Sequence, residues 1–145
     1  MNRLPLAFFT VAALCALAGM IWGILMASSN DFATAPAHAH LNLLGWTSLA
    51  IMGGFYALVD DHAPRFLGWL NFTLSSLGVG VIVPALAELL SGDKSVEPIV
   101  AAGSVLALAG MAVFFLSVVS VWRVTLQTRP GDGRVRILDE SPFSV

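Results

Sequence analysis

The side chains best suited to chemistry in this chain are two imidazoles, His38 and His40, at the start of a long apolar run. Imidazole is a common metal ligand and is costly to place in a lipid bilayer, so an intramembrane pair indicates a functional site. Residues i and i+2 of an α-helix lie roughly 200° apart. The two rings therefore point to opposite sides of the helix. They are badly placed to share one metal ion and well placed to serve two separate partners.

The helix that carries these imidazoles has two distinct faces when about 100° is counted per residue. Below His38 the first face carries Asn42, Gly45, Leu49, Met52, Gly53 and Tyr56. The face centred on His40 carries Leu43, Leu44, Thr47, Ile51 and Gly54. Each imidazole thus heads a stripe with a glycine in it, which leaves room for a flat, bulky group such as a porphyrin. Hydrogen bonding at the headgroup boundary is the alternative, but two such His among only three in the chain favour ligation of haem.

The composition predicts an all-α integral membrane protein. Of 145 residues, 57% are hydrophobic and 11% are charged, which is far from the balance of a soluble domain. A helix of about 20 apolar residues spans a bilayer, and the segments that qualify are residues 4–27, 37–59, 66–90 and 98–126. We predict four antiparallel transmembrane helices in a bundle or arc within residues 1–127, followed by a polar cytoplasmic tail at 128–145.

The distribution of basic residues predicts the topology. With the N-terminus inside, six arginines fall on the inner side and only Lys94 falls outside. This positive-inside pattern predicts that both termini are cytoplasmic, in the inner membrane of a bacterium. A cleaved signal peptide is the alternative for the first segment, although its apolar run is long for that role. A net charge of −2 argues against a nucleic-acid partner.

Other residues offer weaker candidate roles. Asn42 either hydrogen-bonds the edge of a haem or bridges two helices. Glu88, expected at the same outer level, either hydrogen-bonds a ligating imidazole or lies in the headgroup region. Met20 or Met26 offers a second axial ligand within one protomer. His62 is expected in a solvated turn at the inner end.

The first segment carries two features that predict packing rather than chemistry. Gly19 and Gly23 form a G-x-x-x-G pattern, which typically seats a neighbouring helix closely. The lone cysteine, Cys15, is expected to be a buried and inert thiol.

The stretch His38-Ala-His40-Leu-Asn-Leu-Leu-Gly-Trp-Thr-Ser-Leu-Ala-Ile-Met-Gly-Gly-Phe-Tyr resembles the tenth transmembrane helix of subunit I of the haem–copper oxygen reductases, including their C-family oxidase and nitric oxide reductase relatives. In that family an H-x-H pair opens this helix on its outer side. The resemblance implies that His38 corresponds to the ligand of the high-spin haem. It likewise implies that His40 corresponds to the ligand of the low-spin haem.

The chain also departs from that family. The copper centre of the family needs three further His, and only His62 remains here, at the opposite end of the helix. Tyr56 lies too deep to match the crosslinked tyrosine of the oxidases. Reduction of oxygen or NO at a binuclear centre is therefore not expected. Four helices match one of the three four-helix arcs of subunit I, so the resemblance implies a homotrimer that rebuilds the twelve-helix outline.

Three functions follow as hypotheses. The first is a b-type haem membrane protein for electron transfer or for binding haem or a diatomic gas, with His38 and His40 as axial ligands at protomer interfaces. Its partners are the lipid bilayer, further copies of the chain and a redox partner. The second is a copper-binding accessory or assembly protein without haem, using His38 or His40 with Met26 and Glu88. The third is a structural membrane subunit without a cofactor.

Overall fold

The computed structural model describes residues 3–59 and 62–127, which form helices joined by short connections. The elements are α1 (Arg3–Ser29), α2 (Ala35–His40), η1 (Leu41–Ser48), α3 (Leu49–Val59), α4 (Arg65–Leu90), η3 (Lys94–Val96) and α5 (Glu97–Gln127). Because α2, η1 and α3 form one continuous rod, four helices are long and apolar enough to cross a membrane. The predicted number of helices is confirmed, whereas the tail predicted at 128–145 lies outside the described residues.

The helix boundaries lie within a few residues of the predicted ones, since local signals set them. Pro36 stands in the first turn of α2, where its missing N–H has no helical partner to lose. Before η3, the Asp93 carboxylate accepts hydrogen bonds from the backbone N–H and the hydroxyl of Ser95, at 2.9 and 2.6 Å. These bonds hold the pKa of Asp93 below its usual value because they stabilise the charged form.

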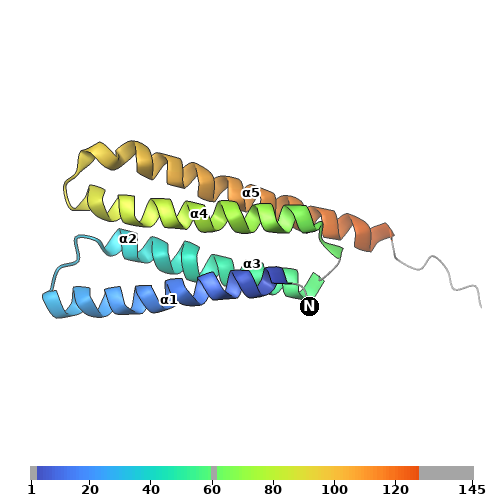
Figure 1. Ribbon diagram of the computed structural model, residues 1–145, viewed down its shortest axis with the longest axis horizontal. Coiled ribbons are helices and arrows are strands. Elements are labelled where there is room, and N and C mark those ends of the chain that lie inside the picture. Colours follow the sequence, from blue (N-terminus) through green and yellow to red (C-terminus); the bar gives the residue numbers. More distant parts are fainter. Residues whose placement is uncertain (1–2, 60–61, 128–145) are drawn as a thin grey trace, which may run out of the picture.

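The helices form two antiparallel hairpins that lie side by side (Figure 1). One hairpin is α1 with the α2–η1–α3 rod, and the other is α4 with α5. Along the chain each long helix packs on the next, and α1 also contacts α4. The start of α1 and the end of α5 lie at the same end of the molecule (Figure 1). Three arginines (Arg3, Arg65 and Arg123) belong to this end, and Lys94 belongs to the other.

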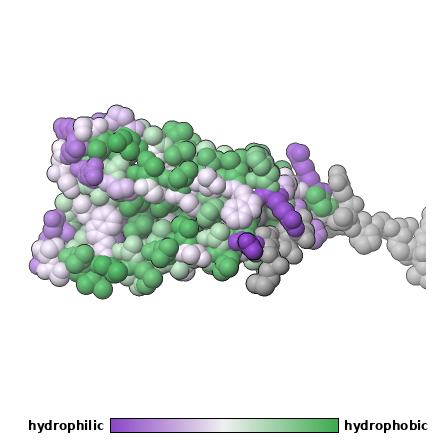
Figure 2. All heavy atoms as spheres, in the orientation of Figure 1, coloured by the Kyte–Doolittle hydropathy of each residue, from purple (hydrophilic) through white to green (hydrophobic). Residues whose placement is uncertain are grey.

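The surface of the molecule is apolar between two polar ends. Figure 2 shows hydrophobic residues over the middle of the helices and hydrophilic residues concentrated toward the ends. Large apolar side chains are exposed along all the long helices, among them Ile24, Ile51, Leu77 and Leu108. Such a surface would be unfavourable in water and is typical of helices in contact with lipid.

Glycines hold α5 against α4 at backbone distance. A Cβ atom placed on Gly78 of α4 would lie 2.7 Å from the backbone nitrogen of Ala107 in α5. A Cβ atom on Gly103 of α5 would lie 2.7 Å from the backbone nitrogen of Ile82 in α4. Small residues allow this close approach, which favours helix association inside a membrane through van der Waals contact.

The second rod is not the uniform α-helix that the sequence predicts. Over residues 41–48 that prediction is wrong, because η1 is a π-helix. The hydroxyls of Thr47 and Ser48 donate to carbonyl oxygens five residues earlier, at 3.2 and 2.8 Å. Gly45 of η1 seats the side chain of Cys15, since a Cβ atom at this glycine would lie 2.8 Å from Sγ. Within the π-helical segment, the two hydroxyls thus bond to the carbonyls of Asn42 and Leu43, and the Cys15 side chain packs against Gly45.

The predicted faces of the rod are confirmed in part. On the His38 face, Gly45, Leu49, Met52, Gly53 and Tyr56 are buried. On the opposite face, Leu43, Thr47 and Ile51 are exposed, but Gly54 is half-buried and Leu44 packs against a buried cluster that includes Val79 of α4. The pattern persists because the rod packs on α1 along one side for its whole length.

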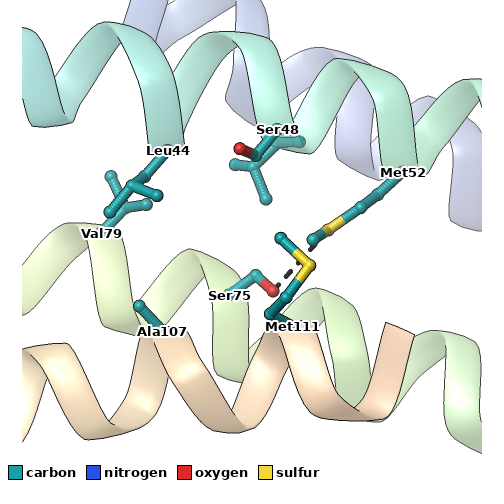
Figure 3. Close-up of a pocket in the computed structure, with 8 residues that line it drawn as sticks. Leu44, Ser48, Met52, Ser75, Val79, Ala107 and Met111 are labelled. Carbon is teal, nitrogen blue, oxygen red and sulfur yellow. Dashed lines mark hydrogen bonds between the residues drawn. The ribbon is translucent and has the colours of Figure 1, made fainter. Parts of the chain in front are cut away.

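A buried polar network joins α3, α4 and α5 in the half of the molecule that holds the start of α1. The Tyr56 hydroxyl donates to Ser117 Oγ at 2.9 Å and accepts from Asn71 Nδ2 at 3.2 Å. Ser75 Oγ lies 2.9 Å from Asn71 Oδ1 and 3.8 Å from Met52 Sδ. A cavity of about 20 Å³, room for about one water, lies beside this network (Figure 3). It is bordered by Met52, Ser75 and Met111 of α5.

Replacing Tyr56 with phenylalanine should lower the free energy of unfolding by about 1–2 kcal/mol, because Asn71 and Ser117 then lose a shared partner in an apolar interior. Reversible unfolding in mixed micelles, followed by circular dichroism, measures this change. Thr73→Val is the matched control, since the exposed Thr73 hydroxyl donates to the Trp69 carbonyl of the same helix and lies outside the network. Equal destabilisation by the two substitutions would contradict a role for the network.

Candidate functional site

His38 lies against α1, where two small residues make room for it. A Cβ atom on Gly23 would stand 3.2 Å from Cε1 and 3.7 Å from Nε2 of the imidazole. The Trp22 ring meets the imidazole edge to face, with ring centroids 6.2 Å apart. One helical turn earlier, a Cβ atom on Gly19 would overlap the amide of Asn42. The pair of glycines therefore seats two polar side chains of the second rod.

Asn42 contacts both the backbone and the ring of His38. Its amide nitrogen donates to the backbone carbonyl of His38 at 2.9 Å and lies 3.3 Å from Nε2. Since an amide nitrogen can only donate, Nε2 is the acceptor and the ring proton is on Nδ1. That Nδ1 is buried, and no partner for it is found in the described part of the chain. His38 thus directs its Nε2 lone pair toward the Asn42 amide, has Gly23 beside its Cε1 atom, and keeps one unsatisfied donor.

His40 has different surroundings but the same tautomer. Its Nδ1 lies 2.8 Å from the carbonyl oxygen of Pro36, one turn earlier in α2. A carbonyl oxygen can only accept, so Nδ1 carries the proton and Nε2 keeps a lone pair. A hydrogen bond of this kind holds the ring in the orientation and tautomer that suit ligation of a metal through Nε2. The two imidazoles do not meet in one site, because the His38 ring lies against Gly23 of α1 and the His40 ring bonds to Pro36 of α2.

An open groove of about 500 Å³ lies beside His38, between α1 and the second rod. It is lined by Gly19, Met20, Gly23, Ile24, Ala27, His38 and Asn42. Its volume falls in the range of small-molecule and cofactor sites. Met20 is the one methionine of the predicted pair that shares this groove with an imidazole.

The other predicted side chains lie elsewhere. Met26 is buried, and its sulfur accepts a hydrogen bond from the Thr34 hydroxyl at 3.7 Å. Glu88 is exposed near the end of α4, and within residues 3–59 and 62–127 no hydrogen bond joins its carboxylate to an imidazole. His62 belongs to the opposite end of the molecule, where Nδ1 donates to the Val59 carbonyl at 2.9 Å.

Two features of the site were missed from the sequence. The G-x-x-x-G pattern was assigned to helix packing, whereas it cradles the side chains of Asn42 and His38. Trp22 was given no role beside the imidazole. The i, i+4 spacing of His38 and Asn42 was a usable signal for their hydrogen bond. No local pattern indicated which segment would lie opposite them.

Among the described residues, no group of three or more His, Cys, Asp or Glu side chains lies close enough to hold a metal ion. Comparison with protein-family models, curated proteins and solved structures finds no match to this chain.

Proposed function

We propose that this chain is a b-type haem-binding protein of the bacterial inner membrane, with both termini in the cytoplasm and with His38 and His40 as axial ligands. The observation that carries the proposal is the shared tautomer of the two rings. Each holds its proton on Nδ1 and has its basic nitrogen at Nε2, which in His38 accepts from the Asn42 amide. A bound haem supplies one-electron redox chemistry, or a site for a diatomic gas where one axial position stays open.

The residues around His38 fit a flat cofactor. The groove is bordered by glycines and apolar side chains, and a side chain at Gly23 would stand against the Cε1–Nε2 edge of the imidazole. The neighbouring Asn42 amide occupies the lone pair of Nε2 at 3.3 Å, a long contact that a metal would replace. The shorter bond of the same amide to the His38 carbonyl can hold Asn42 in place when that happens.

The second axial ligand of each haem is best supplied by another copy of the chain. His38 faces α1, whereas His40 bonds only within its own helix turn, so one chain does not bring the two rings together. In a ring of three protomers, His40 of one chain and His38 of the next would clamp one haem at each interface. Met20 is the alternative partner for His38 within one chain. Mass analysis that gives a haem-containing monomer would exclude the trimer and favour Met20.

An absorption spectrum of the purified protein tests the haem proposal. Reduction with dithionite should produce sharp α and β bands, because two strong-field axial ligands give low-spin iron. A colourless protein that binds copper would replace haem with the copper-binding function. A colourless protein that binds neither would leave only a structural role.

Replacing Gly23 with leucine should remove most of the haem absorbance, since the added side chain occupies the groove beside the Cε1–Nε2 edge of His38. The measurement is the ratio of the Soret band to protein absorbance in the purified sample. Gly80→Leu is the matched control, because Gly80 belongs to α4 and nothing lies within 4 Å of a Cβ atom at that glycine. Full haem content in the Gly23→Leu protein would rule out this groove as the cofactor site.

A further inference from the structure

A second groove lies at the other end of α1 from the imidazoles. It is open, measures about 490 Å³, and runs between α1 and α4. Its walls are Leu6, Ala7 and Val11 on one side and Trp69 and Phe72 on the other, with Arg3 at the start of α1. At 1.5 Å per residue, Arg3 stands about 30 Å along α1 from Gly23. This groove is therefore separate from the proposed haem site.

A close contact between the two helices produces the groove. Leu4 is buried against α4, where a Cβ atom on Gly68 would overlap its side chain. This contact draws the start of α1 onto the start of α4 and leaves the residues beside Leu4 along an open edge. Trp69, next to Gly68, meets Phe72 edge to face with ring centroids 5.7 Å apart. The two aromatic rings that line the α4 side of the groove therefore pack against each other.

The chemistry of the lining is that of an amphiphile site. Among the described residues that line the groove, Arg3 is the one that carries a charge, and the hydroxyl of Thr10 donates to the Leu6 carbonyl at 2.8 Å. From Arg3 to Val11 the groove follows about 12 Å of α1. A guanidinium binds a phosphate through paired hydrogen bonds, and tryptophan is typical of the headgroup level of a bilayer. The rest of the lining suits an acyl chain.

We propose that this groove is a binding site for one anionic phospholipid, with its phosphate on Arg3 and an acyl chain along Leu6, Val11 and Trp69. The proposal rests on a membrane location and not on haem. It uses none of the residues proposed as ligands, so its failure and that of the haem proposal are distinguishable.

Native mass spectrometry of the full chain in detergent tests this site. The probes are phosphatidylglycerol and phosphatidylcholine with the same acyl chains. The wild-type protein should retain one phosphatidylglycerol in preference to phosphatidylcholine. Arg3→Gln should weaken phosphatidylglycerol binding about fivefold, the effect of about 1 kcal/mol for one basic residue near a charged lipid. Binding of phosphatidylcholine should stay unchanged.

Two further variants separate this site from general charge effects. Arg123→Gln removes an exposed arginine at the same end of the molecule that does not line the groove, and it should leave lipid retention unchanged. Trp69→Leu removes part of the apolar wall and should weaken the binding of both phosphatidylglycerol and phosphatidylcholine. Equal retention of the two lipids by the wild-type protein would overturn the proposal. So would retention of phosphatidylglycerol that is insensitive to Arg3→Gln.

Discussion

Substitution of His40 by alanine should abolish the sharp reduced α and β bands of the purified protein, and substitution of His38 should do the same. Each imidazole is proposed to supply one of two strong-field ligands, so loss of either leaves iron without its low-spin state. The hydrogen bonds of Nδ1 in His40 and of Nε2 in His38 indicate that both rings present the tautomer needed for this role. Reduced-minus-oxidised spectra at equal protein concentration measure the loss.

Rescue distinguishes ligation from a structural role of the imidazoles. Free imidazole added to the His40→Ala protein should restore part of the sharp bands, because it can enter the space left by the missing ring. His62→Ala is the matched control: its ring bonds to the Val59 carbonyl at the other end of the molecule, and its spectrum should equal that of the wild type. Unchanged spectra in both the His38 and the His40 variants would refute the ligand assignment.

Substitution of Gly78 by valine should destabilise the protein by about 3 kcal/mol, the upper range for overpacking of a well-packed interface. The new Cβ atom would lie 2.7 Å from the backbone nitrogen and 2.9 Å from Cα of Ala107. A backbone contact of this kind cannot be relieved by a change of rotamer. Helix α5 must therefore move away from α4, the helix on which it mainly packs. Unfolding in mixed micelles gives the free-energy change.

Gly80→Val is the control for this substitution. Gly80 lies two residues further along the same helix, and nothing lies within 4 Å of a Cβ atom placed there. The valine at position 80 would face open space, so its effect on the free energy of unfolding should stay within about 0.5 kcal/mol. Similar losses of stability at positions 78 and 80 would show that glycine at 78 is not required for close packing.

The sequence by itself determined the number of helices, their approximate ends and the polarity of the two ends of the molecule. These follow from apolar length and from residues such as Pro36, which act within one turn of the chain. It also placed His38 and His40 on separate sides, since the angle between residues i and i+2 is a property of a single helix. The hydrogen bond from Asn42 to His38 is likewise set by a single helix, because it joins residues one turn apart.

Only the tertiary structure decided what surrounds those residues. In the folded chain, Gly23 lies against the His38 ring and Cys15 contacts Gly45. The Tyr56 hydroxyl forms a hydrogen bond with Ser117, which is 61 residues away in the chain. In a helix that is apolar on all sides, periodicity carries little information about which face meets which neighbour. Close packing between segments sets those contacts, and with them the π-helical turn and both grooves.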